Sequence, residues 1–342
     1  MDSPSFPTPA RAHAAAGGVA SLADVRAIAE KLRARMRYDI MGRDDVIELA
    51  LVAVLSGGHV LLEDYPGSGK TTLAKALGES IIDDQPDNAI ACFRRLQFTP
   101  DMLPSDITGV MIFDVTSNQF HFRRGPIFAY VVLVDEINRT SPKVQAALLE
   151  SMAERQVTVD NVSHPLDPLF FVIATQNPLD SVGTYPLPVA QLDRFLFKIR
   201  MEHIDRGDEL EVLASWGKPR GRCELPRVAR GDVCAARACL QDEVVVSDRV
   251  HACLVDIARG IRADRRTAQG VSTRSLVQAI PALQALAAIR GRDFVAPEDI
   301  EHLATPLFRH RVIVVPGTDA PEVVVSDALR GPLEALTRST VA

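Results

Sequence analysis

The 342-residue sequence lacks several features that would place it in specialised protein classes. It has no run of 18 apolar residues, which argues against a transmembrane helix. Its 38 lysines and arginines are outnumbered by 44 aspartates and glutamates, giving a net charge of -6. This balance argues against a strongly basic nucleic-acid coat or a polybasic membrane binder, although a small local basic patch is compatible with it. Aromatic residues make up only 5%, so aliphatic side chains must fill most of the core.

The cysteines also give no sign of a metal site or a redox pair. The five cysteines form no CxxC pair and no Cys/His zinc spacing. Residues 1–20 are rich in Ala, Pro, Ser and Gly but lack the apolar segment of a secretory signal. We therefore expect a cytoplasmic protein with packed, reduced thiols. Residues 1–20 are expected to be a flexible tail, with a partner-binding role left open, and the length suggests about two domains after it.

A glycine-rich loop follows the first apolar strand. His59 to Glu63 reads as a buried strand, and an apolar helical pattern begins at Leu73. The residues between them that are predicted to hold a nucleotide are Pro66, Gly67, Ser68, Gly69, Lys70, Thr71 and Thr72. The glycines allow backbone N–H groups to surround phosphate oxygens, Lys70 would neutralise the β- and γ-phosphates, and Thr71 would bind Mg²⁺. Asp64 stands where GxxxxGK[ST] has its first glycine, and a simple glycine turn is the alternative.

A second apolar strand ends in two carboxylates. Tyr130 to Val134 is continuously apolar and leads into Asp135 and Glu136. Side chains at the carboxyl end of a parallel strand lie where open α/β sheets bind ligands. We expect Asp135 to hold the Mg²⁺ water shell and Glu136 to be the general base that activates water. A solvated acidic strand end is the alternative.

A third apolar segment ends in an amide. Leu169 to Thr175 precedes Gln176 and Asn177, and an amide at this edge can bind the γ-phosphate and the attacking water. Asn before Pro is also typical of a turn. The order of the three motifs along the chain favours the catalytic interpretation of Asn177.

These motifs resemble those of AAA+ ATPases, and the longer stretches resemble the MoxR branch of that superfamily. The matching stretches are QFTPDMLPSDITG (97–109), RRGPIFAYVVLVDEINRTSPKVQAALLESMAERQVTV (123–159), ATQNP (174–178), GTYPLPVAQLDRF (183–195), GVSTR (270–274) and GRDFVAPEDIEHLA (291–304). The resemblance implies a P-loop α/β wedge with a parallel five-stranded sheet over residues 21–201. A small α-helical lid with a C-terminal extension would follow over residues 202–342.

The resemblance also implies residues outside the three motifs. Arg194 matches an arginine finger that reaches the nucleotide of the neighbouring subunit, although a local surface arginine is the alternative. Arg274 matches the sensor-2 position, expected to act in cis, and a solvent-exposed helix start is its alternative. Met41 and Gly42 match a segment lining the adenine, or else form an ordinary apolar turn. Arg139 is left open.

An alternating apolar pattern from Gly109 to Phe122 predicts a β-hairpin. In the family this region faces the centre of a ring. Phe113, Phe120 and Phe122 would then contact a client protein, or they would simply pack the hairpin onto the wedge.

The resemblance finally implies an activity. We expect an ATP- and Mg²⁺-dependent ATPase that forms a homo-oligomeric ring, a hexamer by the resemblance, and remodels protein clients. A separate protein with a von Willebrand factor A domain would be its partner in cofactor insertion or complex maturation. The alternatives are a nucleic-acid motor or loader, disfavoured by the net charge, and a non-hydrolysing nucleotide-gated scaffold, disfavoured by Lys70, Glu136 and Arg194. A metabolite kinase would need a pocket for its acceptor substrate, and the sequence gives no signal for one.

Overall fold

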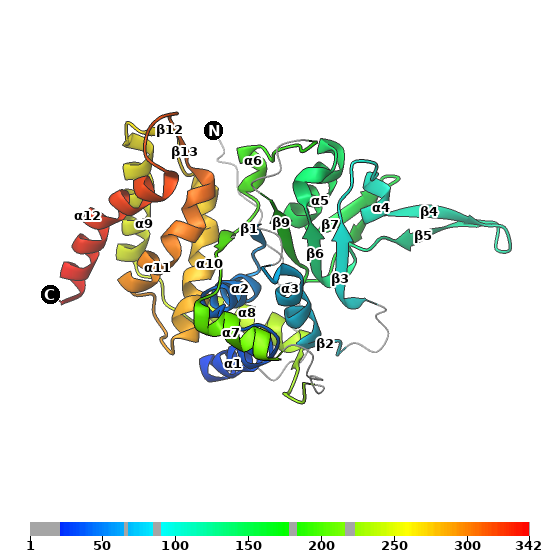
Figure 1. Cartoon of the computed structure of the whole chain (residues 1–342), viewed down its shortest axis with the longest axis horizontal. Coiled ribbons are helices and arrows are strands. Elements are labelled where there is room, and N and C mark those ends of the chain that lie inside the picture. Colours follow the sequence, from blue (N-terminus) through cyan, green and yellow to red (C-terminus); the bar gives the residue numbers. More distant parts are fainter. Residues whose placement is uncertain (1–20, 65–67, 85–89, 178–182, 216–222, 342) are drawn as a thin grey trace, which may run out of the picture.

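A computed structural model describes residues 21–341, except 65–67, 85–89, 178–182 and 216–222, and the expected tail 1–20 lies outside it. Its centre is a sheet of five parallel strands in the order β10-β1-β9-β6-β3 (Figure 1). The strands are β1 (Val60–Asp64), β3 (Ala91–Gln97), β6 (Ala129–Asp135), β9 (Phe171–Gln176) and β10 (Phe197–Met201). The predicted parallel five-stranded sheet is therefore confirmed.

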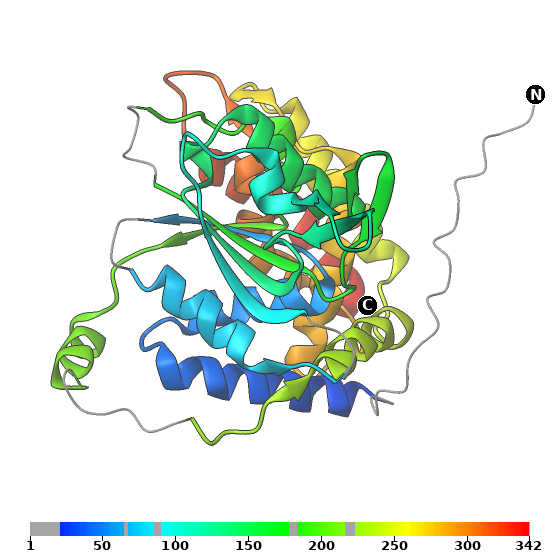
Figure 2. The same ribbon diagram turned by 90° about the vertical axis from the view of Figure 1, so that its right-hand side faces the viewer.

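Both faces of the sheet are covered, because successive strand side chains point to opposite sides. On β6, Val131 and Leu133 pack with one set of helices, whereas Val132 and Val134 pack with another. The first set comprises α1 (Leu22–Asp39), α2 (Asp44–Ser56) and α3 (Lys70–Glu79), and the second is mainly α5 (Pro142–Glu154). Figure 2 shows the sheet between these layers. Burial on both faces explains why β6 is apolar throughout.

The ends of the first two helices follow local sequence signals. The Ser21 hydroxyl caps α1 by accepting a hydrogen bond from the Asp24 N–H at 3.3 Å. Helix α2 ends at Gly57, whose φ of 72° is left-handed and suits glycine. A side chain at Gly58 would overlap Leu196, so this glycine permits close packing beside the sheet.

The helices after β10 lie in the region expected to form the lid. They are α7 (Arg206–Ser215), α8 (Arg230–Glu243), α9 (Asp248–Ala263), α10 (Thr273–Ile289), α11 (Pro297–Phe308) and α12 (Pro321–Val341). Helix α8 packs against α1 and α2, and α12 packs against α9 and α11. One apolar core joins helices α8 to α12 to the sheet, whereas α7 contributes no buried residue to it. The boundary at residue 201 stays a prediction. Residues 321–341, near the C-terminal end of the chain, form α12.

The remaining elements are short. They are the helices α4 (Pro104–Thr108) and α6 (Val189–Leu192), the 3-10 turns Ile137–Arg139 and Arg309–Arg311, and the strand pairs β2 (Ile81–Ile82) with β11 (Val228–Ala229), β7 (Gln156–Val159) with β8 (Val162–Pro165), and β12 (Thr267–Gln269) with β13 (Ile313–Val314). Among the helices described, none combines the length and apolarity needed to span a membrane.

The predicted hairpin is present as β4 (Gly109–Asp114) and β5 (Gln119–Arg124), and it projects from the body in Figure 1. Phe113 and Phe120 lie opposite each other with ring centroids 5.1 Å apart, and they are 45% and 64% exposed. Phe122 instead packs against Phe128 and stacks on His164. Two of the three aromatic side chains are therefore available at the surface, and the third anchors the hairpin.

Two histidines, His59 and His310, are buried in the folded protein. His59 accepts a hydrogen bond from the Val172 N–H at Nδ1, 3.0 Å away, and burial lowers its pKa to about 3. His310 lies 3.1 Å from the Phe195 carbonyl oxygen through Nε2, and burial lowers its pKa well below the ordinary value. Both are therefore neutral in the folded protein at pH 7.

These histidines predict acid sensitivity. Below pH 6.5 the unfolded chain binds protons that the folded protein excludes, so the free energy of unfolding should fall as the pH is lowered towards 5. Each histidine contributes a limiting slope of about 1.4 kcal/mol per pH unit. Urea unfolding at a series of pH values should show a shallower slope for His59→Asn. The exposed His251→Gln is the matched control, and an unchanged slope in His59→Asn contradicts the assignment.

Candidate nucleotide-binding site

The glycine-rich loop leads directly from β1 into α3. Gly69 caps α3 with a left-handed φ of 93°, and a Cβ placed on it would meet no described atom within 4 Å. No side chain of the described residues caps the helix, so its first N–H groups lack a side-chain acceptor there. Ser68 Oγ is buried without a hydrogen-bond partner among the described residues. This is an anion cradle, and Lys70, Thr71 and Thr72 form the first turn of its helix.

Two of the predicted binding residues, Pro66 and Gly67, lie outside the described residues. The cradle therefore rests on Gly69, Ser68 and the start of α3.

The carboxylates follow β6 at the same edge of the sheet. Asp135 is buried, and Glu136 takes a left-handed φ of 56°, which is uncommon for a residue other than glycine. The Glu136 N–H donates to Thr175 Oγ1 at 2.9 Å, and the Thr175 hydroxyl lies 3.4 Å from Asp135 Oδ1. Thr175 on β9 thereby fixes the turn that presents both carboxylates.

Sequence reasoning missed the side chains that hold these carboxylates. Arg95 Nε lies 2.6 Å from Asp135 Oδ2, and Gln97 Nε2 donates to Glu136 Oε2 at 2.8 Å. Arg139, which the sequence left open, also contacts Glu136 Oε2, at 3.1 Å. Gln97 pairs with Asp135 in the β3–β6 register, which brings the ends of both strands together. The sequence did hold a signal for them. Arg95 and Gln97 are polar residues two positions apart at the end of β3, so their side chains point to the same face of the strand.

Asn177 completes this edge. It follows Gln176, which pairs with Glu63 near the end of β1. Because β9 lies between β1 and β6, Asn177 emerges between the glycine-rich loop and the carboxylates. The three predicted motifs thus converge at one edge of the sheet.

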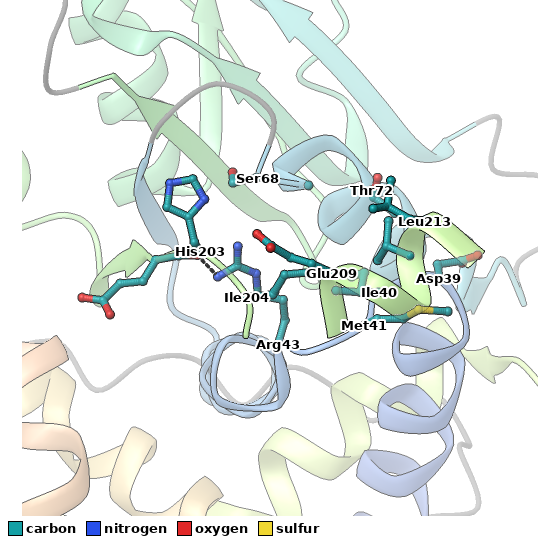
Figure 3. A pocket seen from close by; sticks show the side chains of 13 residues that line it. Asp39, Ile40, Met41, Arg43, Ser68, Thr72, His203, Ile204, Glu209 and Leu213 are labelled. Carbon is teal, nitrogen blue, oxygen red and sulfur yellow. Dashed lines mark hydrogen bonds between the residues drawn. The ribbon is translucent and has the colours of Figure 1, made fainter. Parts of the chain in front are cut away.

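A pocket of about 440 Å³ opens beside the cradle (Figure 3). Ser68, Gly69 and Thr72 line one part of it, and Ile40 and Met41 line another. Gly42 lies in the same link, with a left-handed φ of 65°, and a side chain there would overlap the Asp208 carboxylate. The predicted apolar segment therefore borders the phosphate cradle.

Helix α7 supplies a pocket wall that sequence reasoning did not assign. Val212 and Leu213 line the pocket with Ile204, and Leu213 remains 70% exposed. No residue of α7 is buried, although its sequence carries several apolar side chains. Such an apolar wall suits the flat face of a base.

Arg194 and Arg274 line a different cavity, of about 170 Å³. Gly57, Gly58 and His59 also line it, and they precede β1, whereas the P-loop follows β1. A five-residue strand spans about 16 Å, and none of the described P-loop residues lines this cavity. The structure therefore groups Arg274 with Arg194 at the far end of β1, away from the described P-loop residues, and its expected role in cis stays a prediction.

Asp193 ties the segment that carries Arg194 to the lid. Its carboxylate accepts hydrogen bonds from Ser275 Oγ at 2.9 Å and Ser272 Oγ at 3.3 Å. Arg311 Nε lies 2.7 Å from the same carboxylate and is itself almost completely buried. The backbone next to Arg194 is therefore held by three lid residues.

Two parts of the chain match known domain families. Residues 59–197 match the "ATPase family associated with various cellular activities (AAA)", and residues 259–329 match the AAA lid domain. A solved structure from Cytophaga hutchinsonii, assigned as an ATPase, superposes with a TM-score of 0.81 at 32% identity. It covers 90% of this chain and 95% of its own.

Curated relatives extend over most of the chain. Uncharacterized protein YeaC of Bacillus subtilis is 45% identical over 81% of this chain and 84% of its own. Chaperone MoxR1 of Mycobacterium tuberculosis is 36% identical over 92% of this chain and 84% of its own. Protein MoxR of Methylorubrum extorquens is 28% identical over 93% and 97%. Together with the sheet, the lid and the convergent strand ends, these matches show that the chain belongs to the MoxR family of AAA+ ATPases.

Proposed function

We propose that this protein is an ATP-hydrolysing chaperone that works as a ring and remodels protein clients. The observation that carries the proposal is the convergence of Lys70, Glu136 and Asn177 at one sheet edge, with Arg194 at the other end of β1. The name of the M. tuberculosis relative supports the chaperone role.

ATP binding follows from the cradle and its neighbouring pocket. The α3 N-terminus and Gly69 receive the phosphates, Lys70 neutralises them, and Met41 with Val212 contacts the base. The oxygens of Thr71 and Asp135 suit Mg²⁺, which prefers hard oxygen ligands and retains several waters. Bound Mg²⁺ would neutralise developing phosphate charge. The open space beside Gly69 and the orphaned Ser68 hydroxyl are compatible with this ligand.

Hydrolysis follows from the carboxylate edge. Glu136 polarises the attacking water, and Gln97 and Arg139 orient its carboxylate. Asn177 positions the water and the γ-phosphate from the adjacent strand. Arg194 cannot serve its own nucleotide from the far end of β1, so it stabilises the charge developing in the neighbouring subunit's site.

Ring assembly follows from this arrangement, because every nucleotide site then needs Arg194 from a neighbouring subunit. The exposed Phe113 and Phe120 at the hairpin are proposed to contact the client. By resemblance to MoxR-type ATPases, we extend the proposal to a hexamer and a separate partner with a von Willebrand factor A domain. That partnership would serve cofactor insertion or the maturation of a protein complex.

The first test is the dependence of ATP hydrolysis on protein concentration. We expect the rate per protomer to rise with concentration to a plateau, because dilution removes the neighbour that supplies Arg194. Size-exclusion chromatography at each concentration shows the assembly. A constant rate from a protein that stays monomeric throughout would refute the shared site.

Lys70→Ala should lose most ATP binding, because the phosphates lose their main counter-charge. Titration with a fluorescent ATP analogue measures this loss. Lys75→Ala, also on α3 but paired with Glu79 on the exposed side, is the matched control and should bind normally. Equal affinity in Lys70→Ala and Lys75→Ala would remove the P-loop assignment.

Glu136→Gln should keep ATP binding and assembly but slow hydrolysis by about 10²–10⁴-fold, because only the water-activating group is removed. Steady-state phosphate release at saturating ATP measures the rate. The exposed Glu150→Gln on α5 controls for a general loss of charge. Near-normal turnover in Glu136→Gln would show that another group is the base.

A further inference from the structure

The cavity at the far end of β1 contains a third arginine to which neither the sequence motifs nor the proposed function assigns a role. Arg155 ends α5, Arg194 precedes β10, and Arg274 stands in the first turn of α10. All three line the same space of about 170 Å³. None of the described residues that line it is an Asp or Glu. Three separate parts of the chain thus bring positive charge to one cavity.

Two carboxylates near these arginines already have arginine partners. Asp193 is bound by Arg311, and Asp167 lies 2.9 Å from Arg230 Nη2. Among the described residues no carboxylate forms an ion pair with Arg155, Arg194 or Arg274. The Nε of Arg194 is buried without a hydrogen-bond partner in the described part of the chain. The cavity therefore has an excess of positive charge that nothing within the described chain neutralises.

A further arginine behind the cavity increases this excess. Arg237 donates to the carbonyl oxygens of Val54 and Pro168, and its other terminal nitrogen, Nη2, has no partner among the described residues. Burial, with the charge of Arg155 adding to it, lowers the pKa of Arg237 to about 10, and the group stays charged at pH 7. Adjacent unpaired guanidinium groups are a favourable setting for an anion.

Contacts with two backbone carbonyl oxygens fix the orientation of the Arg155 guanidinium. Its Nη2 donates to the Gly57 carbonyl oxygen at 3.1 Å, and its Nη1 lies 3.5 Å from the Pro168 carbonyl oxygen. Its backbone is left-handed, with a φ of 51°, and its side chain remains exposed. A Cβ at Gly57 would lie 2.9 Å from Nη2, so glycine leaves room for the guanidinium. The anchored, exposed group presents its remaining N–H donors to an incoming ligand.

The ligand must be an anion that reaches this face from outside the subunit, because the subunit's own P-loop is about 16 Å away along β1. We propose that Arg155 acts with Arg194 and Arg274 as a three-arginine clamp on the triphosphate of the neighbouring subunit's ATP. This inference rests on the shared site proposed above. The clamp adds Arg155 from α5 and Arg274 from the lid to the single arginine expected there. It makes both the α/β layer and the lid sense the neighbour's phosphates.

Arg155→Gln tests the clamp. Its kcat should fall by about 100-fold, the typical effect of removing one donor from developing charge, with assembly retained and its own P-loop still binding the fluorescent ATP analogue. Arg155→Lys, which keeps the charge but loses the planar fork, should fall less. Arg338→Gln, on α12 and paired with the exposed Glu334, is the control and should match the wild type.

Mixing variants separates this inference from the proposed function. Arg155→Gln subunits have an intact P-loop, and Lys70→Ala subunits have intact arginines, so mixed rings should regain activity that neither has alone. Arg194→Ala mixed with Lys70→Ala is the reference for a shared site. If the reference mixture also stays inactive, the shared site itself fails.

Other outcomes overturn the clamp alone. These are a kcat for Arg155→Gln within twofold of the wild type, no recovery on mixing while the reference pair recovers, and weakened assembly with normal turnover at saturating ATP and high protein. The last result would make the arginines partners of a protein carboxylate. If a lowered urea midpoint shows that Arg155→Gln is destabilised, the folded variant Arg155→Lys is used in its place. A wild-type kcat in Arg155→Lys then overturns the clamp.

Discussion

The buried ion pair between Arg311 and Asp193 joins the two parts of this molecule. The Arg311 side chain is only 2% exposed, so its charge must be compensated within the protein. Asp193 supplies the opposite charge, Gln278 Oε1 accepts at 2.6 Å, and the carbonyl oxygens of Phe195 and Leu196 accept further hydrogen bonds. Loss of either charged partner would leave a buried ion uncompensated. The lid and the strand that follows Arg194 are therefore held in one arrangement.

The contacts of Asp193 also link movement of the lid to movement of Arg194. Asp193 is adjacent to Arg194 in the chain, and it also accepts hydrogen bonds from Ser272 and Ser275 near Arg274. A rotation of the lid would therefore move the segment carrying Arg194 together with α10. In the proposed ring, the angle of the lid and the reach of the arginines towards the next subunit are coupled.

The parallel sheet separates the two functional regions of a subunit. The groups proposed to bind phosphate and to activate water lie at the carboxyl ends of β1, β6 and β9, whereas Arg155, Arg194 and Arg274 lie at the opposite end of β1. A rigid sheet keeps these regions about 16 Å apart. A subunit built this way cannot bring Arg194 or Arg274 to its own nucleotide. Completion by a neighbour is therefore a geometric requirement of the proposed mechanism.

The sequence by itself determined the features that depend on residues close together in the chain. The strand, glycine loop and helix around Lys70, the apolar strand before Asp135 and Glu136, and the hairpin strands were all readable from local pattern. The tertiary structure alone decided which distant segments meet. It brought Arg95 and Gln97 to the carboxylates, α7 to the pocket beside Met41, and Arg274 to Arg194 instead of the P-loop. Local periodicity shows which face of an element is buried, but packing between elements far apart in the chain fixes which side chains share a cavity.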